Sequence, residues 1–359
     1  MSEKIQKELQ LYREKIDHID LRLLELINER ASMAQKIGEI KGTAAVYNPE
    51  REAKVLNRLR EKNIGPLSDE SVIRLFREIM SECLALEKPL SVAYLGPQGT
   101  FTQQATIRQF GHAAKTIACQ SIDEAFHLVE IRQADYLVVP IENSTEGGVG
   151  RTLDLLVSTP LLVHGEVTLR IHHQLLSKAN QLKDVKKILA HPQALAQCHE
   201  WLNKNLNLVP KIPVSSNAEG AKIAQDDPSI ASIGSIIAAE IYQLNVLGFN
   251  IENEANNSTR FLALGHQTTQ STGNDKTSLI ISAPNQPGAV HYLLEPFSQH
   301  KISMSKLESR PSRGGLWEYI FFIDIEGHIQ DKNVQLALDE LKKRASFVKW
   351  IGSYPVSPL

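Results

Sequence analysis

The chain has 359 residues, of which 42% are hydrophobic and 22% charged, and its formal net charge is −2. This composition is typical of an ordinary soluble protein, and the charge favours neither nucleic acid nor an anionic membrane as a partner. The length is sufficient for two or three domains, each with its own hydrophobic core.

The first residues, MSEKIQKELQLYREK, lack the apolar core of a signal peptide. No segment reaches the ~20 apolar residues that are needed to span a bilayer. The three cysteines, Cys83, Cys119 and Cys198, lie far apart and form no CxxC pair. This spacing favours a reducing compartment and argues against a disulfide framework or a thiolate zinc site. We therefore expect a cytoplasmic protein that uses no metal and no cofactor.

Residues 1–90 are rich in charge, with 16 Lys or Arg and 16 Asp or Glu, which favours a helical bundle. Apolar residues recur at three- and four-residue spacing between Ile5 and Ile40. This spacing predicts a first helix of roughly 36 residues that ends near Gly42.

Two shorter helices are predicted to follow. The first of these begins at Asn48-Pro49, where Asn can cap a helix and Pro fits its first turn, and it ends at Gly65-Pro66. The next runs from Ser68 to about Glu87. Because these two helices are much shorter than the first, they leave part of its apolar stripe uncovered. We therefore expect a partner chain to cover it.

Two basic residues interrupt this pattern. Arg30 lies within the apolar face of the first helix and Lys41 follows eleven residues later, so the two project from one face about 16 Å apart. Such residues often only extend their charge into solvent. The strings YREKID, LLELINERASMAQKIGEIK, YNPERE and RLFREIMSECLALE, however, resemble the all-helical chorismate mutase family. The resemblance implies a domain over 1–90 that rearranges chorismate to prephenate.

The same resemblance implies which side chains act on chorismate. Lys41 and Glu87 occupy the catalytic positions at the breaking ether bond, where Glu87 can donate a hydrogen bond only when protonated. The implied substrate-binding residues are Arg13, Arg30, Asn48, Arg51, Glu52 and Cys83. Some relatives carry Asp in place of Asn48 and Ser in place of Cys83. Asn48 is also explained as a helix cap alone, and Cys83 is a weak donor.

The spacing of Arg13 and Lys41 has a consequence for assembly. They are 28 residues apart with no proline between them, which on one helix separates them by roughly 42 Å. One chorismate molecule cannot reach both. We therefore expect two first helices to pair antiparallel, so that each site takes Arg13 from one chain and Lys41 from the other.

From residue 91 to 267, short β-branched runs alternate with helical stretches, which predicts an α/β region with a largely parallel sheet. A polar linker, HQTTQSTGND, follows. Four polar clusters lie where strands are expected to end: GPQGTFTQQA, VPIENSTEGGV, AHPQALAQC and NNSTRFLAL. Ligands of open α/β sheets bind at such strand ends, and glycine-rich turns there expose backbone N–H groups.

These clusters, with SNAEGA, resemble the prephenate dehydratase family. The resemblance implies two α/β lobes similar to type II periplasmic binding proteins, with the chain crossing near His172 and returning near Asn253. Prephenate loses CO₂ and its ring hydroxyl, and this hydroxyl leaves only if it receives a proton or a strong hydrogen bond. Thr259 matches the residue with that role. The implied substrate-binding residues are Glu142, Asn143, Ser144, Gln193, Glu219, Arg260 and Phe261.

Other polar residues of this region have alternative interpretations. Arg260 fits a structural salt bridge as well as a contact with a substrate carboxylate. Glu142 or Glu219 can act as an acid only when protonated. We interpret His172, His173 and His191 as structural, because no spacing of His, Asp and Glu here suggests a metal.

The last part, residues 275–359, predicts a βαββαβ order, the ferredoxin-like α+β arrangement. The strings PNQPGAV and ESRP resemble the ACT regulatory domain of prephenate dehydratases, which pairs across a two-fold axis and binds an amino acid there. The implied effector-binding residues are Gly288, Ala289, Val290, Glu308, Ser309, Arg310 and Pro311. Val290 stands where that family usually has Leu. A dimerisation module without a ligand is the alternative.

We thus expect a homodimeric or larger bifunctional enzyme that acts on chorismate and prephenate and is inhibited by phenylalanine. One alternative is a dehydratase whose helical segment serves only in dimerisation, but such a segment need not retain Arg13, Arg30, Lys41, Arg51 and Glu87. Another alternative is a ligand-binding sensor on the periplasmic-binding fold, which Thr259 and the 142–144 loop disfavour.

Overall fold

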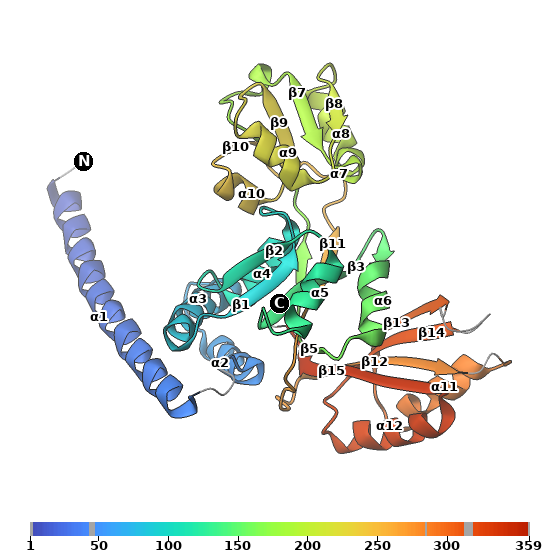
Figure 1. Ribbon diagram of the computed structural model, residues 1–359. Coiled ribbons are helices and arrows are strands. Elements are labelled where there is room, and N and C mark those ends of the chain that lie inside the picture. Colours follow the sequence, from blue (N-terminus) through green and yellow to red (C-terminus); the bar gives the residue numbers. More distant parts are fainter. Residues whose placement is uncertain (1–2, 43–46, 284–285, 312–318, 358–359) are drawn as a thin grey trace.

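The computed structural model describes residues 3–42, 47–283, 286–311 and 319–357. In the described residues, helices α1 to α3 are followed by two α/β lobes and then by a sheet with helices α11 and α12, in the arrangement that Figure 1 shows. This order confirms the predicted fold class: all-α, then two-lobed α/β, then ferredoxin-like α+β. Within the described ranges, no helix combines the length and the apolar character needed to cross a membrane.

The N-terminal helices are α1 (Glu3–Lys41), α2 (Pro49–Lys62) and α3 (Asp69–Glu87). Side-chain caps define two of their starts. Asn48 Oδ1 accepts a hydrogen bond from the Arg51 N–H at 2.6 Å, and Ser68 Oγ accepts one from the Ser71 N–H at 3.2 Å. The three predicted helices are confirmed, and the first is 39 residues long.

Helix α1 projects from the rest of the chain (Figure 1). None of its residues is buried, and apolar side chains such as Ile16 and Leu24 are 55% and 57% exposed. Its last turns pack on α3, where Gly38 lies against Glu87. The apolar stripe of α1 therefore has no cover from the residues that the structure describes.

The first α/β lobe is a sheet with the strand order β2-β1-β3-β11-β5, to which β4 adds beside β3. Its strands are β1 (Ser91–Leu95), β2 (Lys115–Cys119), β3 (Tyr136–Asn143), β4 (Gly147–Gly148), β5 (Leu162–Arg170) and β11 (Ser258–Gly265). Its helices are α4 (Phe101–Phe110), α5 (Ile122–Glu130) and α6 (Gly150–Ser158).

The second lobe is a sheet with the order β10-β6-β9-β7-β8. Its strands are β6 (Gln174–Ser177), β7 (Lys187–Ala190), β8 (Lys211–Pro213), β9 (Ile230–Gly234) and β10 (Asn245–Gly248). Its helices are η1 (Leu182–Asp184), α7 (Pro192–Gln197), α8 (His199–Asn205), α9 (Asn217–Ala224) and α10 (Ile236–Ile241). The chain enters this lobe through 171–173 and leaves it through 249–257, as predicted.

Both sheets are mixed, so the prediction of a largely parallel sheet was wrong. Strands β1, β2 and β3 are parallel, as are β7, β8 and β9. Strand β11 runs antiparallel to β3 and β5, and β6 runs antiparallel to β9 and β10. Parallel neighbours need a crossover connection, which is usually a helix. Strands β5 and β6, and strands β10 and β11, are instead joined by the two passages of the chain between the lobes, and they pair antiparallel with their neighbours.

The C-terminal part is an antiparallel sheet with the order β13-β14-β12-β15. Its elements are β12 (Asp275–Ala283), α11 (Ala289–Gln299), β13 (Met304–Pro311), β14 (Tyr319–Glu326), α12 (Lys332–Arg344) and β15 (Phe347–Pro355). This confirms the predicted βαββαβ order. The third strand of this order is predicted from the sequence over 316–326, and the first residues of that range lie outside the described residues.

Strand β12 of this C-terminal sheet is buried on both faces. Leu279 and Ile281 face the core shared with α11 and α12, whereas Ile280 and Ile351 belong to a core shared with the first lobe. Strand β15 lies along β5, and Gly352 approaches so closely that an added Cβ would be 2.5 Å from the Val163 carbonyl oxygen. The C-terminal domain is thus packed as a continuation of the first lobe.

Candidate active sites

A cavity of about 520 Å³ lies among the N-terminal helices. Seven of the residues predicted to act on chorismate line it: Arg30, Lys41, Asn48, Arg51, Glu52, Cys83 and Glu87. They come from α1, from α2 and its cap, and from α3. Asn48 both caps α2 and lines the cavity, so its two interpretations are compatible. Seven of the eight positions that the family resemblance implied for chorismate thus face one cavity.

Arg13 does not line this cavity. It is 17 residues before Arg30 on the uninterrupted helix α1, which separates the two by roughly 26 Å. The segment of α1 that carries Arg13 is exposed, and no other described part of the chain buries it. A single chain therefore does not bring Arg13 to the cavity.

Two carboxylates of the cavity have different surroundings. Oε2 of Glu87 is buried and has no hydrogen-bond partner within the described part of the chain, so it is available to a ligand. Glu52 is bound by Arg77, with Nε at 3.0 Å from Oε1. Burial raises the pKa of Glu52, while the charge of Arg77 and hydrogen bonds from Arg77 and Tyr47 oppose this shift.

A second cavity, of about 280 Å³, lies between the two α/β lobes. Thr259, Phe261 and Asn143 reach it from the ends of β11 and β3, and Gln193 reaches it from the first turn of α7. The turns at 99–102 and 215–218 complete its walls from opposite lobes. The cleft therefore lies where strands end, as the sheet rule predicts.

Thr259 is 9% exposed, and its Oγ1 accepts a hydrogen bond from Nδ2 of Asn143 at 2.8 Å. The other end of the Asn143 amide, Oδ1, accepts from the N–H groups of Thr145 at 3.0 Å and Glu146 at 3.2 Å. These bonds fix the orientation of the amide. Because Asn143 donates to Thr259, the hydroxyl proton of Thr259 remains free to be donated to a ligand in the cleft.

Glu142 and Arg260 point away from the cleft. Arg260 is bound to Glu166 at 2.7 Å and to Asp324 of the C-terminal domain at 2.6 Å. Glu142 is bound to Lys306 of the same domain at 2.8 Å. Strand residues alternate between the faces of a sheet, so the neighbours of Thr259 and Asn143 face the other side. Of the two interpretations of Arg260, the structure contains the structural salt bridge.

Ser144 and Glu219 lie near the cleft without lining it. Ser144 Oγ accepts a hydrogen bond from the Ser258 N–H at 2.9 Å. Glu219 accepts hydrogen bonds from the N–H and the hydroxyl of Ser215, a residue that does line the cleft. These bonds lower the pKa of Glu219, so it is ionised and only accepts.

The three histidines have neighbours within the protein. His172 Nδ1 lies 2.7 Å from Glu252. His173 lines the cleft, where burial lowers its pKa, and its Nε2 lies 3.0 Å from Gln197. His191 also lines the cleft and caps α7 by accepting from the Gln193 N–H.

A third cavity, of about 210 Å³, lies in the C-terminal domain at the start of α11. It is lined by Gly288, Ala289 and Val290 together with Tyr319 and Phe321. Glu308, Ser309, Arg310 and Pro311 do not line it, because they lie on β13 at the edge of the sheet. Instead, β13 contacts the first lobe.

Comparisons with known proteins agree with this arrangement. Family models match the type II chorismate mutases over residues 12–88, the prephenate dehydratases over 92–269 and the ACT domain over 277–343. A bifunctional chorismate mutase/prephenate dehydratase of Neisseria gonorrhoeae is 59% identical over 100% of both chains. The chain belongs to this bifunctional family.

Two further relatives extend the comparison. The bifunctional enzyme of Pseudomonas aeruginosa is 46% identical over 99% of both chains. The crystal structure of an Arthrobacter aurescens prephenate dehydratase in complex with L-Phe is 34% identical, with a TM-score of 0.68, and covers 74% of this chain and 90% of that one. The helical cavity is accordingly called the mutase cavity, and the cleft between the lobes the dehydratase cleft.

The sequence alone did not single out several lining residues. The mutase cavity also contains Tyr47, Arg77 and Phe110, and the dehydratase cleft also contains Phe101 and Ser215. Tyr47 lies within the YNPERE string and Arg77 within RLFREIMSECLALE, but neither has a spacing that distinguishes it from a packing residue. Their positions depend on contacts between helices far apart in the sequence.

Proposed function

We propose that the chain converts chorismate to prephenate in the mutase cavity and prephenate to phenylpyruvate in the dehydratase cleft, under inhibition by phenylalanine. The observation that carries this proposal is the gathering of seven predicted side chains around one cavity. A dimerisation bundle has no physical reason to direct three cations toward a shared cavity.

In the mutase cavity, the reaction is an intramolecular rearrangement, so the enzyme needs no nucleophile. Arg30 and Arg51 hold the substrate carboxylates, and Lys41 places positive charge beside the ether oxygen. Glu87 donates to the same oxygen when protonated, and its buried Oε2 has no protein partner within the described residues to compete for that bond. Arg13 enters from a second copy of the chain and completes the site.

In the dehydratase cleft, Thr259 donates a hydrogen bond from its hydroxyl to the leaving ring hydroxyl of prephenate, which takes up a proton from solvent and leaves as water while CO₂ departs. Asn143 keeps the oxygen of Thr259 occupied by an N–H donor, so that the Thr259 proton points toward the substrate. Gln193 and Phe261 hold the ring from the two lobes. Ionised Glu219 orients Ser215 at the cleft wall rather than acting as the acid.

Inhibition would begin in the C-terminal domain. The relative from Arthrobacter aurescens is described with L-Phe, and here the Gly288–Val290 turn lines a cavity with two aromatic residues. Strand β13, which carries Glu308–Pro311, is bound to the dehydratase lobe: Lys306 bridges Glu142 and Glu308 at 2.8 and 3.0 Å. A ligand that recruits Glu308 would therefore loosen a contact beside Asn143.

The three cysteines are free thiols, which fits a reducing compartment such as the cytoplasm. We propose a homodimer as the working unit, because α1 has no cover among the described residues and Arg13 does not reach the cavity of its own chain.

A coupled assay tests the proposal. The purified full chain, given chorismate alone, should form prephenate and then phenylpyruvate, and added phenylalanine should lower the second step. Conversion of prephenate without conversion of chorismate would instead assign the helices to dimerisation. Binding of prephenate without release of phenylpyruvate would exclude an enzyme.

A further inference from the structure

The last turn of α4, which belongs to the dehydratase lobe, forms part of the mutase cavity. Phe110, the last residue of α4, lines that cavity, and Ser81 Oγ of α3 donates a hydrogen bond to its carbonyl oxygen at 2.7 Å. Gly111 has a φ of +75°, and an added Cβ would lie 2.3 Å from Ser81 Cβ. Helix α3 is thus packed directly on the end of α4, without space for any side chain between them.

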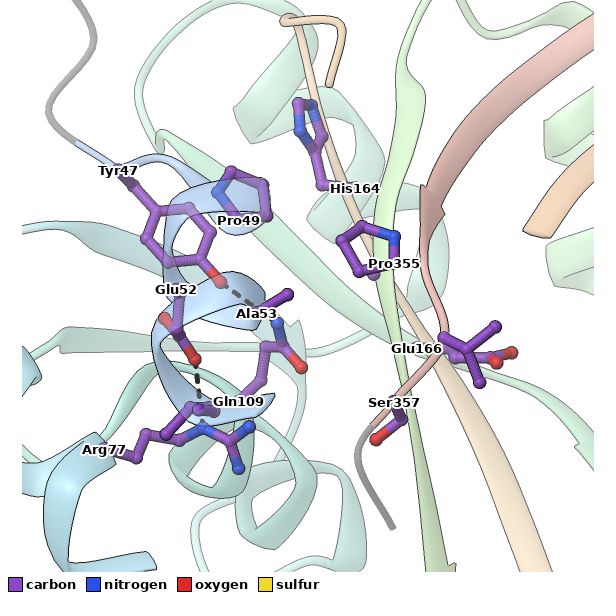
Figure 2. A pocket seen from close by; sticks show the side chains of 13 residues that line it. Tyr47, Pro49, Glu52, Ala53, Arg77, Gln109, His164, Glu166, Pro355 and Ser357 are labelled. Atoms are coloured by element: carbon purple, nitrogen blue, oxygen red, sulfur yellow. Dashed lines mark hydrogen bonds and ion pairs between the residues drawn. The ribbon is translucent and has the colours of Figure 1, made fainter. Parts of the chain in front are cut away.

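Tyr47 connects this junction to the mutase domain. It directly precedes Asn48, the cap of α2, and it is 5% exposed. Its ring packs on Phe110 and Tyr136 of the dehydratase lobe, with centroids 5.2 and 5.4 Å away. Its hydroxyl accepts a hydrogen bond from Nε2 of Gln109 on α4 at 3.1 Å (Figure 2). The dehydratase lobe therefore fixes both the ring and the hydroxyl of Tyr47.

Glu52 lies between Tyr47 and Arg77 and borders two cavities. One is the mutase cavity, and the other is the small pocket at the junction with the dehydratase lobe that Figure 2 shows. Its carboxylate is held by Arg77, whose Nε lies 3.0 Å from Oε1, and the neighbouring hydroxyl of Tyr47 favours its ionised form and so lowers the pKa of Glu52. Tyr47 can give its proton to Glu52 because Gln109 supplies the hydrogen bond that the Tyr47 oxygen accepts.

We propose that Tyr47 and Gln109 are positioning residues for the mutase reaction, through which the dehydratase lobe holds Glu52 ionised and oriented toward the substrate. An ionised carboxylate only accepts hydrogen bonds, so Glu52 in this state accepts from the ring hydroxyl of chorismate. Neither Tyr47 nor Gln109 needs to touch chorismate for this. The inference rests on the proposed function, because it takes Glu52 as a substrate-binding residue of the mutase.

The arrangement explains why Glu52 can be charged despite its burial. Desolvation disfavours a carboxylate in such a place, and each hydrogen bond from a neighbour offsets part of that penalty. One of these neighbours is held in place by a side chain of another domain. The mutase site is therefore completed by the dehydratase lobe, and the two catalytic parts are not independent modules joined by a linker.

The test uses the full chain and measures kcat/KM of the mutase from about pH 5 to about pH 9. Tyr47→Phe removes one hydroxyl and keeps the ring that packs on Phe110. We expect the acid limb of the profile to move to higher pH by about one unit, because ionised Glu52 loses a hydrogen-bond donor. The pH profile of the dehydratase, whose cleft contains neither residue, should stay unchanged.

Gln109→Leu removes the donor that orients the Tyr47 hydroxyl and should move the acid limb in the same direction by a smaller amount. Gln104→Leu is the matched control. It makes the same chemical change on α4 at a residue that lines neither cavity, and it should leave both profiles unchanged. A Glu52→Gln background completes the design. Because it lacks the titrating carboxylate, Tyr47→Phe should cause no further shift there.

The outcomes separate the inference from the proposed function. If Glu52→Gln leaves mutase kcat/KM unchanged, the assignment of Glu52 to the site is wrong. If Glu52→Gln lowers activity but Tyr47→Phe and Gln109→Leu leave the acid limb in place, only the positioning role is wrong. A fall in the mutase and dehydratase activities together, without a pH shift, would mean that these residues only support folding, which also overturns the proposal.

Discussion

Thr259 and Arg260 are consecutive residues of β11, and their side chains contact different domains. Thr259 lines the dehydratase cleft, whereas Arg260 is bound to Asp324 of the C-terminal domain at 2.6 Å. Burial lowers the pKa of Arg260, but its anionic neighbours outweigh this and raise it. A residue of β11 is thus fixed by the C-terminal domain, and any movement of that domain acts directly on β11.

Thr259→Ala should remove the dehydratase activity by a factor of at least about 10², the size of a lost proton donor, while mutase activity stays within about twofold. Thr259→Ser, which retains the hydroxyl, is the matched variant and should recover part of the activity. Phenylpyruvate formation and chorismate loss are measured on the same preparation. Equal loss of both activities in a folded Thr259→Ala protein would refute the role of Thr259.

Val290→Trp should raise the phenylalanine concentration for half-inhibition by about tenfold or more, because the larger ring occupies the cavity beside Tyr319 and Phe321. Turnover without phenylalanine should not change. Leu336→Trp, at an exposed position of α12, is the control. A point substitution is preferable to deletion of residues 270–359, because deletion would expose the core that Ile280 and Ile351 share with the dehydratase lobe. Unchanged inhibition in Val290→Trp would place the effector elsewhere.

Glu87→Leu should lower mutase kcat/KM by at least about 10²-fold, because it removes the group that donates to the ether oxygen of chorismate. Glu87→Gln, whose amide also donates a hydrogen bond, is the matched variant and should retain more activity. Chorismate loss is measured for both variants in folded protein. Equal losses in the two variants would remove Glu87 from the mechanism.

Mixing Arg13→Ala chains with Lys41→Ala chains should restore mutase activity to about a quarter of the wild-type value. Half of the randomly assembled dimers are mixed, and each mixed dimer has one complete site out of two. Each variant alone should be inactive. Labelled subunits must first be shown to exchange. No recovery after demonstrated exchange would mean that each site is built from a single chain.

Protonation of His164 should destabilise the fold below neutral pH. Burial lowers the pKa of His164 to about 4, below the ~6.5 of an unfolded histidine. The stability that neutral His164 provides is present above about pH 6.5 and is lost as pH falls toward 4, because the unfolded chain binds the proton more tightly. Between pH 7 and pH 5 this amounts to about 2 kcal/mol.

His164→Leu should therefore lose less thermal stability between these pH values than the wild type does. His127→Leu, at an exposed position of α5, is the control and should behave like the wild type. Equal decreases in Tm for all three proteins would show that His164 does not cause the acid sensitivity.

The sequence by itself determined those features of the protein that depend on residues close together in the chain. Caps at Asn48 and Ser68 and the apolar spacing of the first helix indicated where the helices lie. Seven residues of the mutase cavity were identified because they belong to strings that resemble a family. Thr259 and Asn143 were identified because they belong to strings that resemble a family. The uncovered stripe of α1 likewise follows from helix length alone.

Only the tertiary structure decided which face of each strand meets the cleft. Alternation along β3 and β11 requires that Glu142 and Asn143, or Thr259 and Arg260, face opposite sides, but it does not say which side holds the substrate. The C-terminal domain decides it by supplying Lys306 and Asp324 to one face. The same is true of Tyr47, whose hydroxyl is directed by Gln109, 62 residues away in the chain. Such contacts join residues that no local period relates, and they form only when separately folded elements pack together.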